Sequence, residues 1–358
     1  MKILFWGTPV YALASLNALV EVGHELVGVV TQPDRRRGRG KELMASPIKA
    51  RALELGLPVF TPERIRKDLT CQEQLAALGA DAYVVVAFGQ ILPPTILAQP
   101  PLGCWNGHGS LLPRWRGAGP IQWCLLAGDS QTGVGVMAME EGLDTGPVLL
   151  ERSLPIGLLD NAHHLAEGLA DLTGSLLVEA LPLLEQAGPG SQVERWARLG
   201  LQSQSEQGMT YARQLVKDDF QLDWSQSGLS LHRKVMGLYP GAHTPWAGKR
   251  LKLLATEPLV QRLRDQLSPE ARPLADQWGQ RPNAGIPFQS HQPDIPHPPL
   301  PPMPVPGTVL AIEPGVGLVI ATGGCPLLLR SGQLEGKASA KGQSLIQQLA
   351  ASPGQQFG

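Results

Sequence analysis

Alternating apolar runs near the start of the chain constrain its fold more than any other feature. Residues 2–6 and 25–31 are strongly β-forming, and residues 11–22 between them carry apolar positions at helical spacing. A strand, a helix and a second strand in this order are typical of a parallel sheet. Residues 82–87 and 133–138 are similar runs, as expected of strands buried inside such a sheet. The sequence therefore predicts an α/β domain with a Rossmann-like parallel sheet.

The first turn of this domain argues against one common ligand of such sheets. Residues 7–10 read Gly-Thr-Pro-Val and lack the three glycines of a dinucleotide-binding turn, which disfavours a nicotinamide cofactor. Further along, we expect helices over 46–55, 62–78 and 163–186, with a short strand at 58–60 and a possible kink at Pro182. We expect this first domain to span residues 1–206.

The pattern changes in the C-terminal part, which we predict to form a second domain over residues 207–358. Short strand-like pieces occupy 249–255, 307–312, 317–321 and 326–330, and glycines bound them, as is typical of a small β-barrel. Thirteen prolines lie between 257 and 306. This density disfavours a continuous helix or a central strand, so we expect an exposed or disordered insertion, with a proline-rich docking ligand as the alternative.

Composition narrows the class of protein. A length of 358 residues suits two domains, and a net charge of −1 provides no global attraction to nucleic acid, so any RNA contact requires a local basic cluster. The four cysteines, at 71, 104, 124 and 325, form no ligand cluster, which argues against zinc and disulfides. No run approaches the ~20 apolar residues of a membrane span. We expect a soluble, cytoplasmic, monomeric protein without a metal.

Three polar side chains are the candidate catalytic groups. Asn106 and His108 are separated by Gly107, so both leave the same face of an extended strand end. Asp144 follows in a glycine-rich segment. A carboxamide, an imidazole and a carboxylate could together hold and protonate a carbonyl during acyl transfer. Taken singly, His108 would more often be structural and Asp144 a turn-capping residue. An aspartic protease is disfavoured because that chemistry needs two aspartates and this chain has one Asp-Thr-Gly triplet.

These segments resemble the signature of the folate-dependent formyltransferases. The resemblance rests on residues 106–113 (Asn-Gly-His-Gly-Ser-Leu-Leu-Pro) and 142–146 (Gly-Leu-Asp-Thr-Gly), and it extends over nearly the whole chain outside the proline-rich stretch. It implies a formyltransferase domain followed by an OB-like barrel that binds tRNA. Two residues depart from the family pattern: Gly107 replaces a larger apolar residue and Gly119 replaces alanine. Extra backbone freedom at Gly107 is expected to affect rate more than chemistry.

The resemblance also implies roles for individual residues. Asn106 and His108 would donate hydrogen bonds to the oxyanion, and Asp144 would orient or charge-stabilise His108. The co-substrate would be 10-formyltetrahydrofolate, and the acceptor the α-amine of initiator methionyl-tRNA. Two sets complete the site: a folate-lining set of Ser110, Leu111, Leu112, Pro113, Ile91 and Leu92, and a tRNA-binding set of Arg35, Arg36, Arg37, Arg39 and Lys41.

The basic set carries five positive residues within residues 35–41. Its glycines predict a mobile loop, which could be an ordinary solvated loop or an arm that grips an acceptor stem. The family's basic loop lies at the matching place, which favours RNA. Glycinamide ribonucleotide and amino-sugar nucleotides remain alternative formyl acceptors. A non-catalytic RNA-binding protein is disfavoured because Asn106, His108 and Asp144 are all present.

Overall fold

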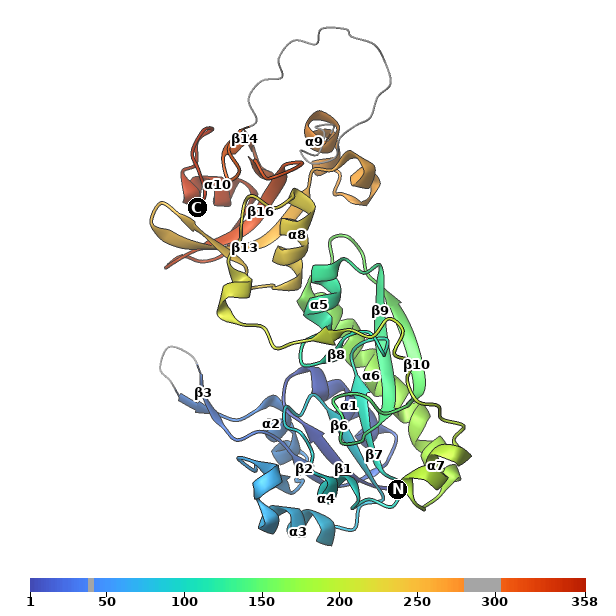
Figure 1. The fold of residues 1–358 in the computed structure, drawn as a ribbon. Helices are drawn as coiled ribbons and strands as arrows, with labels where there is room; N and C mark the ends of the chain where they lie inside the picture. Colours follow the sequence, from blue (N-terminus) through green and yellow to red (C-terminus); the bar gives the residue numbers. More distant parts are fainter. Residues whose placement is uncertain (38–41, 280–303) are drawn as a thin grey trace, which may run out of the picture. The chain divides into compact units, whose positions relative to one another are not determined.

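The computed structural model describes residues 1–37, 42–279 and 304–358, and it contains two compact units (Figure 1). The first unit comprises Met1–Trp123, Ser130–Ile156 and His164–Gln214. The second comprises Cys124–Asp129, Gly157–His163 and Leu215–Gly358. The main division therefore falls after Gln214 rather than at the expected 206, because residues 211 and 212 pair with a strand of the first unit.

A seven-stranded sheet forms the centre of the first unit in the described residues, in the order β10-β9-β7-β6-β1-β2-β5. The five strands from β7 to β5 run parallel, so the predicted α/β sheet is confirmed. Strand β9 runs antiparallel to both of its neighbours, a direction that its apolar sequence did not reveal. The elements of this part of the chain are β1 (Lys2–Gly7), α1 (Tyr11–Glu21), β2 (Glu25–Val30), β3 (Arg35–Arg37), β4 (Glu42–Met44), α2 (Pro47–Glu54), β5 (Val59–Phe60), η1 (Ile65–Lys67), α3 (Leu69–Ala77), β6 (Ala82–Val86), α4 (Pro94–Leu97), β7 (Cys104–His108), β8 (Arg116–Gly117), α5 (Pro120–Ala127), β9 (Gln131–Ala138), β10 (Val148–Pro155), α6 (Ala162–Ala187), α7 (Gln192–Arg198) and β11 (Tyr211–Ala212).

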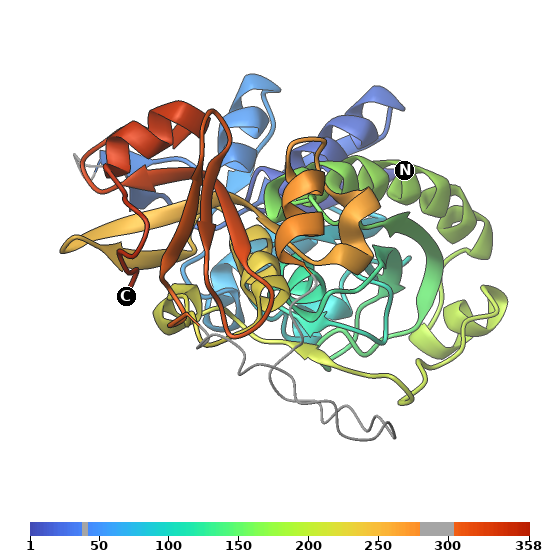
Figure 2. The same ribbon diagram turned by 90° about the horizontal axis from the view of Figure 1, so that it is seen from above.

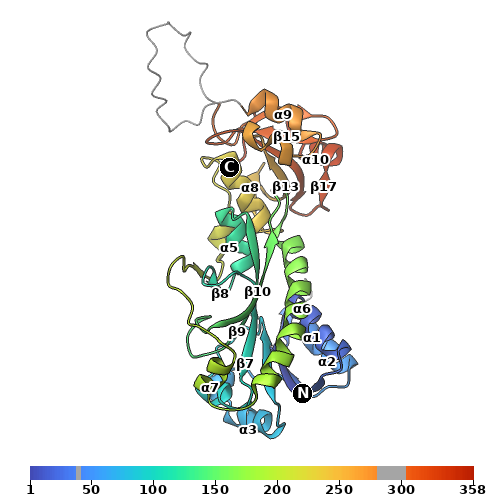
Figure 3. The same cartoon turned by 90° about the vertical axis from the view of Figure 1, so that its right-hand side faces the viewer.

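Helices cover both faces of this sheet. On one face, α3 and α4 pack over a buried cluster that includes Trp6, Tyr83 and Cys104. On the other face lie α1 and α6, which Figure 3 shows on the same side of the strands. These two helices approach closely at Gly174, where an added Cβ would lie 3.1 Å from the Ala14 carbonyl oxygen. Burial on both faces explains why the central strands are apolar along their whole length.

The helix expected over 62–78 is interrupted at Asp68. A 3-10 turn, η1, ends there, and α3 begins with Asp68 as its N-cap, whose carboxylate accepts a hydrogen bond from the Cys71 amide at 3.0 Å. A capping carboxylate satisfies an amide that the first turn of a helix leaves without a partner. The helical prediction for this region is correct in type, and it misses the break.

An antiparallel sheet forms the second unit, in the order β12-β13-β16-β15-β14, with β17 paired to β16. The C-terminal tail links the two edges: the Val309 amide donates to Gln355, the Phe357 amide to Gly307, and the Gly358 amide to Pro245 on β12. The sheet is thereby joined to itself, as a barrel requires. The elements are η2 (Lys217–Phe220), α8 (Gly228–Gly237), β12 (His243–Trp246), β13 (Lys249–Pro258), η3 (Gln261–Gln266), α9 (Ala271–Trp278), β14 (Val309–Glu313), β15 (Gly317–Ile320), β16 (Leu327–Leu334), β17 (Ala340–Lys341) and α10 (Gly342–Leu349).

The proline-rich stretch is folded over its first half, which corrects the predicted insertion at 257–306. Residues 257 and 258 complete β13, and η3 and α9 pack beside the strands of this unit (Figure 2). Leu267 and Leu274 belong to a buried cluster that also contains Val319 and Leu328. Apolar residues at core positions override the local proline content here. The prediction for 280–303 lies outside the described residues.

Within the residues that the structure describes, none of the helices combines the length and the apolar character that a membrane span needs.

Replacing Leu274 with alanine tests whether α9 belongs to the core. We expect the free energy of unfolding of the second unit to fall by about 2–4 kcal/mol, the usual cost of emptying a buried leucine site. Hydrogen exchange of the β15 and β16 amides measures this quantity. Gln277→Ala, at an exposed position of the same helix, is the control and should change it by under about 0.5 kcal/mol. Equal protection in the two variants would contradict a structural role for α9.

Candidate active site

Successive side chains of strand β7 point to opposite faces of the sheet. Cys104, at its start, lies in the core beneath α3 and α4. Asn106 and His108 share that face and extend beyond the core, whereas Gly107 faces α6. Burial raises the pKa of the Cys104 thiol, so this cysteine is a packing residue and no nucleophile.

Asp144 joins the two β7 side chains from the loop between β9 and β10. Its Oδ1 accepts a hydrogen bond from Asn106 Nδ2 at 3.4 Å, and its Oδ2 lies 3.6 Å from His108 Nδ1. The Gly117 amide donates to Oδ2 at 2.8 Å, the shortest of these contacts. The carboxylate is 14% exposed. The structure therefore brings together the three candidate catalytic residues.

The second nitrogen of His108 is also engaged. Nε2 lies 2.9 Å from the Trp115 carbonyl oxygen, and the side chain is 6% exposed. A carbonyl accepts only, so Nε2 carries a proton in this arrangement. Both ring nitrogens thus face oxygens, which suits a ring that donates hydrogen bonds. Before Nε2 can donate to a substrate oxygen, the Trp115 carbonyl must release it.

The residues around Trp115 are held by a distant segment of the same unit. The Trp115 amide donates to Thr210 Oγ1 at 3.0 Å, and the Arg116 amide donates to the Thr210 carbonyl at 3.0 Å. Strand β8 then pairs in parallel with β11. Residues 210–212 lie more than 90 residues after Trp115, so no local sequence pattern places them beside the catalytic residues.

The predicted folate-lining residues fall into two groups. Ser110 is fully buried, and its hydroxyl donates to the Arg114 carbonyl at 2.7 Å, so it stiffens the turn from within. Leu112 is buried beside it, whereas Leu111 and Pro113 are partly exposed. The turn can therefore present backbone groups and two apolar side chains to a ligand.

Ile91 and Leu92, which were predicted together as folate-lining residues, lie in different environments. Leu92 is 3% exposed and belongs to the core under α3 and α4, so its side chain serves packing there. Ile91 is 67% exposed. Val10 is equally exposed and follows the neighbouring strand β1, whose carboxyl end lies at the same sheet edge as that of β6. An isolated valine beyond a strand carries no sequence signal, so the exposure of Val10 is visible only in the structure.

The basic run begins as a strand rather than a mobile loop. Arg35 and Arg36 belong to β3, which pairs antiparallel with β4. Two contacts hold the base of this hairpin: the Asp34–Lys49 ion pair at 2.8 Å, and a hydrogen bond between the Thr31 and Ser46 hydroxyls at 2.8 Å. The mobile-loop prediction is wrong for these residues because strand pairing orders them. Arg39 and Lys41 lie outside the described residues, as does the side chain of Arg37.

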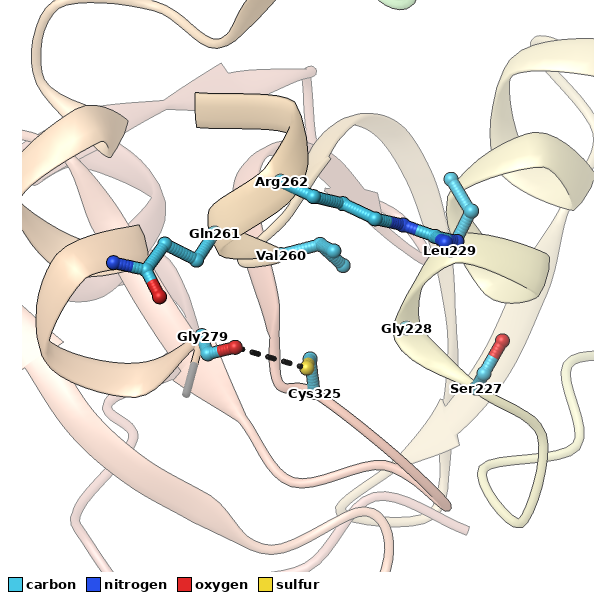
Figure 4. A pocket seen from close by; sticks show the side chains of 8 residues that line it. All are labelled: Ser227, Gly228, Leu229, Val260, Gln261, Arg262, Gly279 and Cys325. Atoms are coloured by element: carbon cyan, nitrogen blue, oxygen red, sulfur yellow. Dashed lines mark hydrogen bonds between the residues drawn. The ribbon is translucent and has the colours of Figure 1, made fainter. Parts of the chain in front are cut away.

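The second unit contains a cavity of about 340 Å³ whose lining differs from the candidate active site (Figure 4). Its polar lining comes from Ser227, Gln261, Arg262 and Cys325. The Cys325 thiol donates to the Gly279 carbonyl at 3.6 Å, and burial raises its pKa. A thiol held in the protonated form is a poor nucleophile, so this cavity does not compete with the first unit as a site of acyl transfer.

Packing explains why a glycine stands at position 107, where it departs from the family pattern. An added Cβ would overlap the Thr173 methyl group of α6, while its other neighbours lie at ordinary contact distances of 3.5 and 3.6 Å. The Thr173 hydroxyl is fixed by hydrogen bonds to Tyr11 Oη at 2.8 Å and to the Leu169 carbonyl at 2.6 Å. Gly119 is different, because a Cβ there would make ordinary contacts from 3.4 Å outward.

Gly107→Ala should therefore lower the free energy of unfolding by about 1–3 kcal/mol, the usual cost of overpacking. Adding Thr173→Ser removes the obstructing methyl group and keeps the hydroxyl, so the double variant should regain most of the loss. Urea unfolding of the two variants and of Thr173→Ser alone measures the coupling. Strictly additive free energies would show that the two sites do not share this space.

Comparisons with known proteins agree with this geometry. Residues 1–181 match the formyl transferase family, and residues 214–350 match its C-terminal domain. A methionyl-tRNA formyltransferase of Synechococcus sp. (strain WH7803) is 63% identical, with 100% of this chain and 98% of that protein covered. One of Prochlorococcus marinus (strain MIT 9303) is 56% identical, with 99% and 98% covered.

Solved structures show the same fold at low identity. A sugar 3N-formyl transferase crystallised with dTDP and 5-N-formyl-THF is 14% identical with a TM-score of 0.57, covering 94% of this chain and 99% of that one. HypX from Aquifex aeolicus in complex with tetrahydrofolic acid is 16% identical with a TM-score of 0.55, covering 99% and 48%. With both family domains matched in order and relatives aligned over its full length, this chain belongs to the formyl transferase family.

Proposed function

We propose that the chain transfers the formyl group of 10-formyltetrahydrofolate to the α-amino group of initiator methionyl-tRNA. The observation that carries this proposal is the meeting of Asn106, His108 and Asp144 at the end of β7. The full-length relatives, named methionyl-tRNA formyltransferase, support the acceptor, because their similarity includes the second domain.

The reaction forms a bond between the amine nitrogen and the formyl carbon and breaks the bond from that carbon to N10 of the folate. Asn106 Nδ2 has two N–H groups and gives one to Asp144, so the other can meet the oxyanion. His108 adds a second donor once the Trp115 carbonyl releases Nε2. The proton lost by the amine ends on N10 of the folate as its bond to the formyl carbon breaks, and Asp144, facing Nδ1, stabilises positive charge on the His108 ring during this transfer.

Folate recognition would use the turn at residues 110–113, with Ile91 as an additional apolar contact. Pterin rings bind to apolar walls with a few directed backbone groups, which this turn supplies. Folate-bound structural neighbours support a folate co-substrate.

A sugar nucleotide is the second candidate acceptor, because the solved neighbours include sugar N-formyltransferases. Their identities of 13–14% support the fold alone. The relatives at 56–63% identity over the whole chain favour the tRNA. We also propose that the protein acts as a monomer in the cytoplasm, where its four buried cysteines would stay reduced.

The β3–β4 hairpin is the proposed tRNA contact. Its strand β3 consists of Arg35, Arg36 and Arg37, and the Asp34–Lys49 pair and the Thr31–Ser46 hydrogen bond fix its base. A hairpin held at its base can present positive charge to phosphates with less loss of conformational entropy than a free loop.

Labelled formyl-folate offered with methionyl-tRNA, glycinamide ribonucleotide and an amino-sugar nucleotide tests the proposed reaction. We expect label on methionyl-tRNA alone. His108→Ala and Asn106→Ala should each lower kcat about 10²–10³-fold, the usual loss for one oxyanion donor. Label on a different acceptor would overturn the substrate, and wild-type turnover by His108→Ala would overturn the mechanism.

Replacing Arg35, Arg36 and Arg37 with alanine should lower kcat/KM for methionyl-tRNA and flatten its dependence on salt. Each lost phosphate contact reduces the slope of log affinity against log salt by about 0.9. The measurement is kcat/KM for the tRNA at several salt concentrations.

Arg64→Ala, Arg66→Ala and Lys67→Ala together provide a matched control, because these residues lie in or beside η1 and are exposed. This variant removes the same charge from another surface and should keep the wild-type slope. An equal loss of slope in the two triple variants would mean that net charge, and not the hairpin, governs the association.

A further inference from the structure

Gln204 joins the loop that carries Asp144 to the turn that contacts His108. Its Nε2 donates to the Asp144 carbonyl at 2.9 Å and to the Gly146 carbonyl at 2.7 Å. Its Oε1 accepts from Arg116 Nε at 3.0 Å and from Nη2 at 2.7 Å. All the ordinary hydrogen-bonding capacity of the carboxamide is used, and donors face acceptors throughout.

These contacts fix the orientation of the amide unambiguously. A guanidinium only donates and a carbonyl only accepts, so exchanging the amide oxygen and nitrogen would break four hydrogen bonds at once. Arg116 is itself 6% exposed, and the next residue, Gly117, donates its amide to Asp144 Oδ2 at 2.8 Å. Gln204, Arg116, Gly117 and Asp144 therefore form a closed ring of contacts.

The backbone of Asp144 needs this support. Its φ is 54°, in the left-handed region that a non-glycine residue adopts at a cost of about 1–2 kcal/mol. Gln204 holds the carbonyls on both sides of Thr145 and so restrains the loop at two points. Without these restraints, the loop could relax and turn the carboxylate away from His108 and Asn106.

We infer that Gln204 is a positioning residue for formyl transfer: it holds the Asp144 loop so that the carboxylate meets His108. It acts through Asp144 and makes no contact of its own with the reacting atoms. The inference rests on the proposed function, and it places part of the catalytic support in the segment that leads to the second domain.

Gln204→Glu is the sharpest test because it keeps the size of the side chain and an acceptor for Arg116. It removes both donors to the Asp144 and Gly146 carbonyls. We expect kcat for methionyl-tRNA to fall about 10- to 100-fold, as for a misplacement of about 1 Å, with both KM values within about 3-fold of wild type. Gln202→Glu makes the same change at an exposed position two residues away and should retain wild-type kcat.

A double-mutant cycle separates positioning from general destabilisation. If Gln204 acts through Asp144, Gln204→Glu should change kcat by less than about 2-fold in an Asp144→Asn background. Losses that multiply fully in the double variant, or a Gln204→Glu enzyme equal to Gln202→Glu, would overturn the inference. Gln204→Met, which also lacks the donors and carries no charge, provides the same cycle if the glutamate variant does not fold.

A wrong acceptor and a wrong role for Gln204 would give different results. A wild-type enzyme that formylates a sugar nucleotide and not methionyl-tRNA would overturn the acceptor, and the same cycle would then be run on the sugar nucleotide. Its expected result is unchanged, because the ring of contacts involves only residues of this chain.

Discussion

The Asp144 carboxylate is the contact on which the catalytic arrangement depends. It receives the Gly117 amide at 2.8 Å and lies within 3.6 Å of His108 and 3.4 Å of Asn106. These groups come from β8 and β7, while Asp144 belongs to a third segment. A partly buried carboxylate is costly unless hydrogen bonds compensate its lost hydration. The site therefore assembles only when all three segments have folded together.

The two faces of β7 depend on each other. Asn106 and His108 can point toward Asp144 because Gly107, between them, lets the strand lie close to Thr173 on α6. Thr173 cannot move away freely, since its hydroxyl is tied to Tyr11 and Leu169. Burial raises the pKa of Tyr11 to about 12, so its hydroxyl stays protonated and continues to serve as a donor. The glycine that was expected to loosen the strand is instead the residue that allows this packing.

The sequence alone could predict those features that depend on residues close together in the chain. The spacing of Asn106 and His108 predicts their common face because alternation is a property of any strand. The place of Asp144 came from family resemblance, and no periodicity would have indicated it. Gln204 lies 88 residues from Arg116 and 60 from Asp144, so no local pattern marks it. The packing of Gly107 against Thr173 is equally non-local.

The two errors about disorder have a common cause. Prolines and glycines were counted as breakers without regard to their position. Pro273 lies in the first turn of α9, where its missing N–H removes no helical hydrogen bond. The next residue, Leu274, is buried in the core of the second unit. In the hairpin, β3 pairs with β4, so the order of these residues depends on strand pairing rather than on composition.

The choice of residue at position 204 follows from the groups around it. Two carbonyls require donors, and the Arg116 guanidinium requires an acceptor. Lysine or arginine would satisfy the carbonyls and repel Arg116, whereas glutamate would attract Arg116 and repel the carbonyls. A primary amide satisfies both, and asparagine is one methylene shorter. Glutamine is therefore the side chain that can connect the Asp144 loop to β8 without leaving a buried polar group unsatisfied.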